Sequence, residues 1–519
     1  METHREVSTV FSRAPAGLEA PVVRVEVHLG TGLPAFNLVG LPEAVVRESK
    51  ERVRAALVTT GYDFPQRRIT VNLSPADLPK EGGRFDLPIA VGILAADRQI
   101  LPPALKHREF YGELSLGGAL RETRKLLPAL IAGARCRSEM ILPAANALEA
   151  SLISGAKLRL VNHLSEVVAA LKGKGSLDVL PTAVTREAGR QADRAASRDC
   201  KVPYSSIPDL AEVHGQYAAK RALEIAAAGE HGLLMIGPPG AGKTLLAQRL
   251  PGLLPPLTEP EVLEVASLES AAGRRPSIGG RRPFRSPQHT ASVAALIGGA
   301  ALRPGELSLA HLGVLFLDEL PEFPRNALEA LREPLESGAV VLARLKRTCE
   351  FPAKFQLVAA MNPCPCGYAG DSRGRCHCTA DQIARYRNRI SGPLIDRIDI
   401  HVELMALPVE HLMPDAREEA ESSAVVAQRV ASARSLQLRR QGKLNARLTP
   451  AEVARHCELA RDSRALLSTA IARLGLSARA YHRVLKVART CADLRGDRDT
   501  RMMDVAEALK LRALDRPAG

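Results

Sequence analysis

A glycine-rich segment at residues 237–244 has the spacing G-x-x-x-x-G-K-T of a phosphate-binding loop. It follows an apolar run at 233–236 that predicts a strand, and it precedes a helical run at 244–250 that we expect to stop at Pro251. Glycines let backbone N–H groups face phosphate oxygens, and the helix that follows adds positive potential. The predicted nucleotide-binding residues of this loop are Gly237, Pro238, Pro239, Gly240, Ala241, Gly242, Lys243 and Thr244.

Two further apolar strands are predicted to end in polar side chains. The run at 312–317 precedes Asp318 and Glu319, and the run at 355–361 precedes Asn362. Acids at the carboxyl ends of parallel strands lie where such sheets bind ligands. We expect Thr244 and Asp318 to hold Mg²⁺ and Glu319 to polarise an attacking water. Asn362 either positions that water or forms a simple turn before Pro363.

Four cysteines lie within fifteen residues: Cys364, Cys366, Cys376 and Cys378. Four thiols are the number that tetrahedral Zn²⁺ requires, although the inner spacing of one residue is shorter than usual. His377 could replace one thiol. The alternative is a set of free thiols in a tight Pro/Gly turn.

Basic side chains gather in two segments. Residues 273–285 hold five arginines, and residues 339–355 predict a hairpin with three basic residues near its tip. Such side chains could follow a phosphate backbone without reading base sequence, or simply face solvent. The predicted DNA-contacting residues are Arg274, Arg275, Arg281, Arg282, Arg285, Arg344, Lys346 and Arg347.

Composition is that of a globular chain with a basic excess. The 519 residues include 71 Lys and Arg against 57 Asp and Glu, a net charge of +14, with 46% hydrophobic residues. A basic balance favours an anionic partner, whereas 3% aromatic residues and no Trp make aromatic base-stacking unlikely to dominate. We expect no membrane span, no signal peptide, and a cytoplasmic protein with reduced thiols.

The chain predicts an α/β fold with three parts joined by one linker. Residues 1–171 alternate strand and helix patterns, residues 172–207 predict a linker, and residues 208–404 predict a second α/β domain. Residues 405–519 are rich in Ala, Arg and Leu, contain several runs with helical spacing from Val425 onward, and predict a helical lid.

The order of these motifs resembles the AAA+ ATPases and, more narrowly, the YifB/ComM family of magnesium-chelatase-like proteins. Besides the loop at 237–244, the resemblance is carried by the segments 282–290, 304–311, 316–323, 360–367 and 391–399, and it extends from about Val22 to Leu514. The family usually has two histidines where this chain has Gln288 and His289, and a glycine where it has Ala300.

The resemblance implies further residue roles. Asn362 matches the sensor 1 position, and Arg397 stands in the context of an arginine finger that reaches the ATP of a neighbouring subunit. Arg479 matches sensor 2 on the lid, with Arg483 as the alternate. The segment 209–216 resembles the adenine-contacting entry of the module. The implied catalytic residues are Glu319, Asn362 and Arg397.

The first 171 residues resemble the α/β fold of the Lon protease domain, of the S5 type. Lon-type enzymes have a serine nucleophile where this chain has Arg84, so we expect no peptidase activity. A role in scaffolding or gripping DNA is left open.

As a whole, the resemblance implies a ring-forming ATPase, most simply a hexamer, that uses ATP and Mg²⁺ to move single-stranded or branched DNA, as in branch migration during natural transformation. One alternative is a chelatase-type ATPase that remodels a partner protein. Another is an ATP-binding scaffold that barely turns over.

Overall fold

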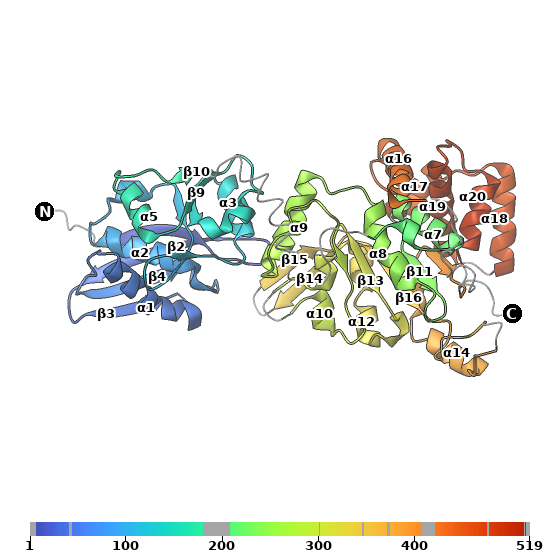
Figure 1. Cartoon of the computed structure of the whole chain (residues 1–519), viewed down its shortest axis with the longest axis horizontal. Coiled ribbons are helices and arrows are strands. Elements are labelled where there is room, and N and C mark those ends of the chain that lie inside the picture. The colour runs from blue at the N-terminus through green and yellow to red at the C-terminus, as the bar shows by residue number, and fades with distance from the viewer. Residues whose placement is uncertain are drawn as a thin grey trace. The chain divides into compact units, whose positions relative to one another are not determined.

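The computed structural model describes residues 7–40, 44–179, 208–299, 302–344, 347–370, 374–406, 421–474, 477–512 and 514. The chain divides into two compact units (Figure 1). The first comprises Met1–Pro203, Glu259–Gly279 and Ala343–Cys349, and the second comprises Tyr204–Thr258, Gly280–Leu342 and Glu350–Gly519. Among the described residues, no helix is long and apolar enough to cross a membrane.

The first unit is built on a mixed eight-stranded sheet in the order β10-β9-β8-β5-β1-β2-β4-β3. Its strands are β1 (Val7–Arg13), β2 (Val22–Gly30), β3 (Ala35–Val39), β4 (Arg68–Ser74), β5 (Arg108–Phe110), β8 (Glu139–Pro143), β9 (Lys157–Val161) and β10 (Asp178–Val179). A small ladder joins β6 (Glu113–Leu114) to β7 (Leu120–Arg121). Its helices are α1 (Ala44–Thr59), α2 (Asp86–Ala96), α3 (Leu127–Arg135), α4 (Ala147–Ala150), α5 (Leu164–Leu171) and α9 (Glu259–Ala271).

Sequence patterns explain the centre of this unit. In β2 the buried residues alternate with exposed ones, as the period of two predicts. Helix α2 is buried along nearly its whole length, because it packs on β1 and β2 on one side and on α1 on another. The predicted linker was expected to begin at Lys172, but β10 pairs with β9, so the sheet continues to Val179. Residues 180–207 of that linker lie outside the described residues.

The second unit has a five-stranded sheet in the order β12-β13-β16-β11-β17, and every neighbouring pair is parallel. The strands are β11 (Leu233–Ile236), β12 (Phe284–Arg285), β13 (Val314–Leu317), β16 (Gln356–Met361) and β17 (Ile400–Glu403). Strands β11, β13 and β16 are buried at every residue, as expected of parallel strands covered on both faces. Parallel pairing brings their carboxyl ends to one edge, where the polar residues at 237–244, 318–319 and 362 follow.

Helices cover this sheet: α7 (Tyr217–Gly229), α8 (Lys243–Leu253), α10 (Val293–Ile297), α11 (Glu306–Leu309), α12 (Arg325–Glu329), α13 (Arg332–Ser337), α14 (Ala380–Arg387) and α15 (Gly392–Ile395). The expected stop of α8 at Pro251 is wrong, because the helix continues to Leu253. The lost N–H of Pro251 falls in the last turn, and Leu253 there is completely buried in the core.

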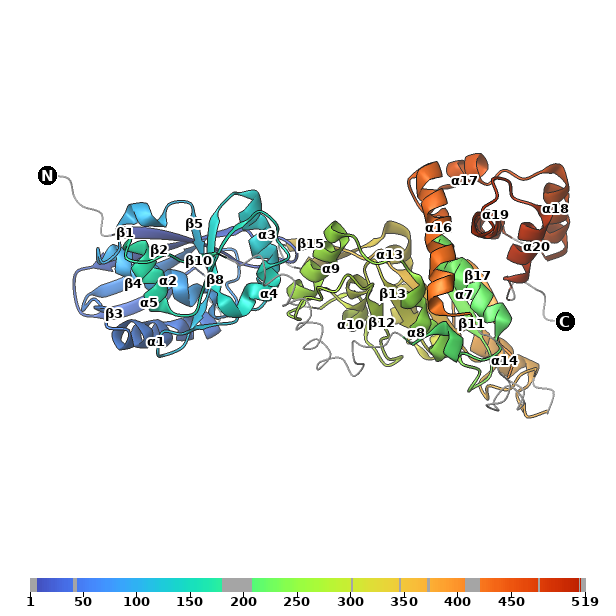
Figure 2. The ribbon, with the colours of Figure 1, turned by 45° about the horizontal axis from the view of Figure 1, so that its top comes forward.

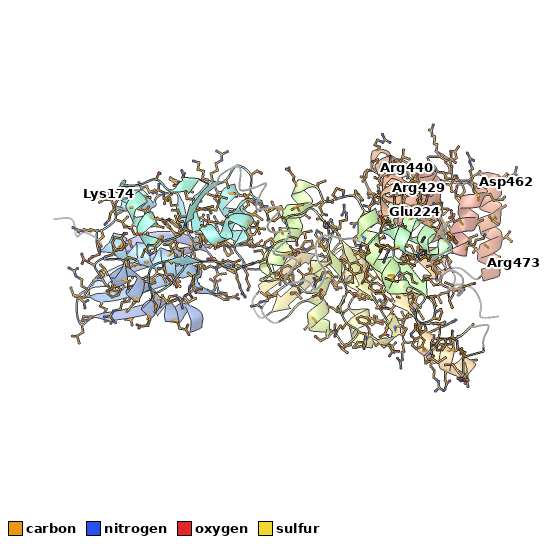
Figure 3. The ribbon with its side chains drawn as sticks, in the orientation of Figure 1. Lys174, Glu224, Arg429, Arg440, Asp462 and Arg473 are labelled. Atoms are coloured by element: carbon orange, nitrogen blue, oxygen red, sulfur yellow. The ribbon has the colours of Figure 1, made fainter. Side chains whose placement is uncertain are left out.

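The predicted helical lid is confirmed. It contains α16 (Ser423–Gln441), α17 (Pro450–His456), α18 (Arg461–Leu474), α19 (Ala478–Leu494) and α20 (Met502–Lys510). Helix α16 lies along α7 (Figure 2), and the lid shares one apolar core with α7, α8 and β11. Arg429 of α16 and Glu224 of α7 form an ion pair of 2.6 Å across this contact (Figure 3). The lid is therefore packed directly on the helices that flank the phosphate-binding loop.

The predicted hairpin is present as β14 (Ala339–Arg344) and β15 (Arg347–Pro352). Arg344 and Arg347 lie at the facing ends of the two strands, and Lys346 lies outside the described residues.

Candidate nucleotide site

The loop after β11 has the backbone geometry that phosphate binding requires. Gly240 and Gly242 adopt φ angles of 78° and 87°, which favour glycine, and a Cβ at either would meet no atom within 4 Å. Gly242 is the N-cap of α8 and supplies no side-chain cap. The first N–H groups of α8 are therefore left for an anion at its positive end.

Lys243 lies over this loop in the middle of the site. Its Nζ donates to the carbonyl oxygens of Gly237 at 2.6 Å and Pro238 at 3.0 Å, and to Oδ1 of Asn362 at 3.0 Å. Burial lowers the pKa of the Lys243 ammonium, and the carboxylates of Asp318 and Glu319 oppose that shift. The predicted loop lysine and the predicted sensor 1 amide are thus in direct contact.

The two predicted magnesium-holding side chains also meet. Thr244 Oγ1 donates to Asp318 Oδ2 at 2.7 Å. A hydroxyl and a carboxylate at this separation are hard oxygen ligands of the kind Mg²⁺ takes together with phosphate oxygens. The structure therefore brings Lys243, Thr244, Asp318 and Asn362 together from three strands.

Glu319 has a partner that the sequence patterns did not reveal. His289 Nδ1 lies 3.2 Å from Glu319 Oε2, and both side chains are about half exposed. Glu319 also has a left-handed backbone with φ of 54°, at the start of the turn Leu320–Glu322. In the sequence, His289 stands out only as part of the motif segment 282–290, and that motif alone does not predict a contact with Glu319.

The segment 209–216 connects the loop to the lid. Gln216 Nε2 donates to the carbonyl oxygens of Ala241 in the loop, at 3.1 Å, and of Met405 after β17, at 2.8 Å. Asp209 Oδ1 accepts from the backbone N–H of Ser423, at the start of α16, at 2.9 Å. This segment therefore contacts the phosphate-binding loop, and its role in holding adenine stays a prediction.

Arg397, the predicted arginine finger, is held by its own chain. Its Nη1 donates to the carbonyl oxygen of Pro393 at 2.6 Å, and its Nη2 forms an ion pair with Glu336. Only 11% of its side chain is exposed. Reaching a nucleotide on another subunit would require this side chain to leave Glu336.

The two candidate sensor 2 residues have different surroundings. Arg479 is exposed in the first turn of α19. Arg483, one turn later, donates to the backbone oxygen of Arg397 at 3.1 Å and forms an ion pair with buried Asp399. Asp399 also contacts His231 at 3.0 Å, and Arg483 and His231 both help to hold its pKa well below the usual range. Arg483 therefore fastens α19 to the strand that follows the finger, which leaves Arg479 the better candidate.

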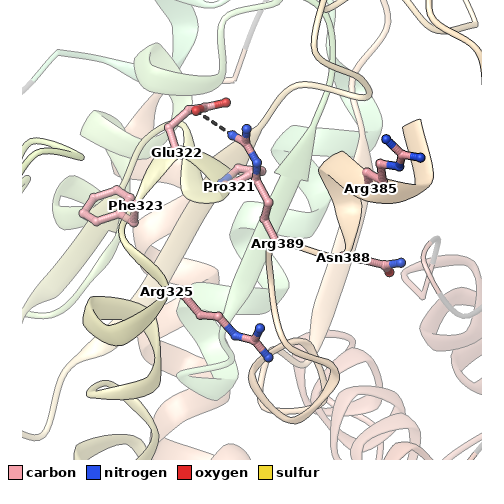
Figure 4. Close-up of a pocket in the computed structure, with 7 residues that line it drawn as sticks. All are labelled: Pro321, Glu322, Phe323, Arg325, Arg385, Asn388 and Arg389. Atoms are coloured by element: carbon pink, nitrogen blue, oxygen red, sulfur yellow. Dashed lines mark hydrogen bonds and ion pairs between the residues drawn. The ribbon is translucent and has the colours of Figure 1, made fainter. Parts of the chain in front are cut away.

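A pocket opens beside the turn that follows Glu319 (Figure 4). Its lining includes Arg325, Arg385 and Arg389, of which Arg389 pairs with Glu322 at 2.8 Å. The pocket joins the region of the predicted catalytic acid to α14, the helix that follows the cysteine segment.

The four clustered cysteines converge, although 371–373 in their segment lie outside the described residues. All four sulfur atoms lie within 4.8 Å of one another. Cys364 is buried and the other three are half-buried, whereas His377 is exposed. The structure therefore brings the four predicted zinc-ligand thiols together, and the binding of an ion stays a prediction.

The predicted DNA-contacting arginines fall into both units. Arg274 and Arg275 belong to the first, where Arg275 pairs with Glu122 at 3.0 Å. Arg281, Arg282 and Arg285 belong to the second. Arg282 donates to the carbonyl oxygens of Pro255 and Leu312, both at 2.7 Å, and Arg285 in β12 forms a two-bond pair with Glu306 at 2.6 and 2.8 Å. The structure describes no side chain at 344–347.

Arg84, which the resemblance places at the position of the Lon-type serine, is buried in the first unit. Its Nη2 donates to the backbone oxygen of Arg124 at 2.6 Å, and burial lowers its pKa to about 10. Arg84 is thus held by main-chain oxygen, as a core residue would be.

The residues at the carboxyl edge of the second sheet fit a nucleoside triphosphate with Mg²⁺. Free N–H groups of α8 and Lys243 suit phosphate, and Thr244 with Asp318 suits the ion. Sequence comparison agrees with this fit. The model described as "Magnesium chelatase, subunit ChlI" matches residues 209–412, "Subunit ChlI of Mg-chelatase" matches 25–146, and "Magnesium chelatase, subunit ChlI C-terminal" matches 420–512.

Full-length relatives share this organisation. Competence protein ComM of Haemophilus influenzae is 47% identical over 515 residues, which cover 98% of each chain. YifB of Escherichia coli is 45% identical over 513 residues, also 98% of each chain. The magnesium-chelatase 67 kDa subunit of Heliobacterium mobile is 28% identical over 228 residues, 38% of this chain and 33% of that one. The chain therefore belongs to the YifB/ComM family of magnesium-chelatase-like AAA+ proteins.

Proposed function

We propose that this chain is an ATP-hydrolysing motor that assembles as a ring, most simply a hexamer, and moves single-stranded or branched DNA. The observation that carries the ATPase part is the convergence of Lys243, Thr244, Asp318 and Asn362 at the carboxyl ends of β11, β13 and β16. Family membership supports ATP and Mg²⁺ as the ligands of this edge.

The proposed mechanism assigns one task to each side chain. When nucleotide binds, the Lys243 ammonium exchanges its hydrogen bonds to the Gly237 and Pro238 carbonyl oxygens for bonds to phosphate oxygens. The N–H groups at the start of α8 donate to the other phosphate oxygens. Thr244 and Asp318 hold Mg²⁺, which neutralises phosphate charge when bound. Glu319 orients and polarises the attacking water, and Asn362 fixes the γ-phosphate side of the site. Arg397 of a neighbouring copy stabilises the charge that spreads over the transferring phosphoryl oxygens.

The proposal that DNA is the substrate rests on the positive charge of the chain and on the name of a full-length relative. The chain carries a net charge of +14, and basic residues cluster at 273–285 and at the turn of the β14–β15 hairpin. The Haemophilus relative is named a competence protein, and it matches this chain over 98% of its length. Both favour DNA as the substrate, and the family resemblance implies branch migration in natural transformation as the process.

The test is ATP hydrolysis with and without forked DNA, followed by strand displacement on a synthetic junction. We expect the junction to stimulate hydrolysis and to be unwound only with ATP. Glu319→Gln should bind ATP and DNA but lose hydrolysis by about 10²-fold or more, since the water is no longer polarised. Normal hydrolysis by Glu319→Gln would refute the water-polarising role of this residue. A wild-type ATPase rate that no DNA changes, together with no strand displacement, would refute the motor function.

The second candidate is a chelatase-type ATPase that remodels a partner protein. The names of the three matching family models and the Heliobacterium relative favour it. It predicts turnover that DNA does not change, which the same assay distinguishes.

A further inference from the structure

We propose that Cys364, Cys366, Cys376 and Cys378 bind one zinc ion, and that this ion fixes the segment after β16 against the phosphate-binding loop. The four sulfurs come from both ends of one segment, and all lie within 4.8 Å of one another. Four thiolates without an open position match a structural zinc site.

The distances between the sulfurs fit one shared ion better than a disulfide or an iron–sulfur cluster. Cys364 and Cys366 are 3.3 Å apart, Cys366 and Cys376 are 3.6 Å apart, and Cys364 and Cys376 are 3.8 Å apart. Zn–S bonds of about 2.3 Å in a tetrahedron separate each pair of sulfurs by about 3.8 Å. A disulfide would need about 2.05 Å, and thiolates bound to separate irons of a cluster would lie farther apart than thiolates that share one ion.

The local backbone supports a closed site. The N–H of Ala369 donates to Cys364 Sγ at 3.2 Å, and the N–H of Gly367 donates to the Cys364 oxygen at 3.0 Å. N–H donors to sulfur stabilise thiolate ligands and orient them. Without such an ion, one buried and three half-buried thiols would face one another.

Two features place this cluster next to the nucleotide site. Gly367 has a φ of 86°, and a Cβ there would lie 2.7 Å from Cδ of Pro239 in the phosphate-binding loop. Asn362, which accepts from Lys243, lies only two residues before Cys364. The turn that the cysteines close is therefore packed on one element of the site and continuous with another.

The cysteine segment leads directly into α14. Thr379 directly follows Cys378 and forms a capping box with Gln382 at the start of that helix. Tyr386 of α14 is buried in the core and is hydrogen-bonded to the backbone of Asn362. The chain before Cys364 and the helix after Cys378 thus both meet Asn362, so a bound ion would help to fix this residue from two sides.

The first experiment measures metal in the full-length chain, purified without chelators. We expect about one zinc per chain by elemental analysis, and Co²⁺ substitution should produce the visible absorption bands of tetrahedral thiolate coordination. Cys376→Ser should reduce zinc by about tenfold or more. Cys136→Ser changes an exposed thiol of the first unit and should retain all zinc. A folded, metal-free wild-type chain, or one iron in place of zinc, would overturn the assignment.

The second experiment tests the coupling, which rests on the proposed ATPase activity. Releasing zinc from the wild-type chain with a thiol-reactive mercurial should lower kcat by about tenfold while nucleotide binding changes little, because a displaced Asn362 harms the reacting geometry more than phosphate binding. Cys378→Ser should reproduce this effect if it remains folded by circular dichroism. An unchanged kcat in the zinc-free, folded protein would overturn the coupling. Zinc present in a chain without any ATPase activity would instead refute the proposed function.

Discussion

Glu319 is the residue on which hydrolysis depends in the proposed mechanism, and in this structure His289 lies 3.2 Å from its carboxylate. A carboxylate that is paired with an imidazole is less available to accept a proton from water. His289 belongs to the segment that also carries Arg282 and Arg285, which are predicted to face DNA. If this segment contacts DNA as proposed, the His289 contact links it directly to the proposed catalytic carboxylate.

Replacing His289 tests this route. An exposed contact of this kind is worth at most the ~1 kcal/mol of an exposed ion pair, so His289→Ala should raise the DNA-independent rate by up to about fivefold and reduce stimulation by DNA. Steady-state ATPase rates with and without forked DNA measure both effects. Gln288→Ala, which changes the exposed neighbouring residue, should behave as the wild type. A fall of both rates in His289→Ala would show that the imidazole orients Glu319 for catalysis.

Among the elements, helix α19 presents two arginines with separable tasks. Arg483 is paired with buried Asp399, which directly precedes β17, and Arg479 is exposed one turn earlier. Arg483→Ala should lower the free energy of unfolding by about 3 kcal/mol, since Asp399 would lose a charged partner. Arg479→Ala should leave stability unchanged and weaken ATP binding or slow turnover. Urea unfolding and nucleotide titration of both variants check this. If Arg483→Ala instead weakens nucleotide binding at unchanged stability, Arg483 is the nucleotide ligand.

Strand β17 predicts a pH dependence of stability. Burial, together with the nearby charge of Arg512, lowers the pKa of His401 to about 3 from its ordinary 6.5, so the folded chain keeps this ring neutral. The unfolded chain binds a proton below pH 6.5, so the contribution of His401 is full above that pH and declines as the pH falls towards 3. Between pH 7 and pH 5 the loss is about 2 kcal/mol.

Urea unfolding at the two pH values measures this loss. His401→Gln cannot titrate and should show a correspondingly smaller difference between pH 7 and pH 5, whatever its absolute stability. His214→Gln replaces an exposed histidine of the same unit and should retain the wild-type difference. An equal pH dependence in wild type and His401→Gln would assign the effect to other groups.

The elements show where sequence patterns are sufficient and where they fail. Strand β11 and the loop after it were predictable, since apolar runs and glycine spacing are local properties. The contact of His289 with Glu319 was not, because it depends on how β12 pairs with β13 thirty residues later. The predicted end of α8 at Pro251 was wrong because a proline is a local signal for a helix end and does not show that buried leucines follow it. The choice between Arg479 and Arg483 likewise depended on Asp399, which is distant in sequence.

At the scale of the whole molecule, the proposed assembly must explain Arg397. This side chain is directed onto Glu336 of its own chain and is 11% exposed, so it does not act on the nucleotide edge from this position. If it acts on a neighbouring copy, hydrolysis requires Lys243 of one subunit and Arg397 of the next. The activity should then depend on protein concentration, and Arg397→Ala should lose turnover at saturating ATP while still binding nucleotide.

Mixing two inactive variants separates action between copies from action within one. Lys243→Ala and Arg397→Ala should each be inactive, but their mixed rings contain interfaces where an intact Lys243 meets an intact Arg397. Random assembly at equal amounts restores up to about a quarter of the interfaces, which the ATPase rate measures. Lys243→Ala mixed with Glu319→Gln is the matched control, because these two residues serve the same subunit's nucleotide and no mixed interface repairs the site. Recovery in the first mixture alone places Arg397 in the neighbour's site, whereas no recovery in rings that demonstrably exchange subunits would show that Arg397 acts within its own chain.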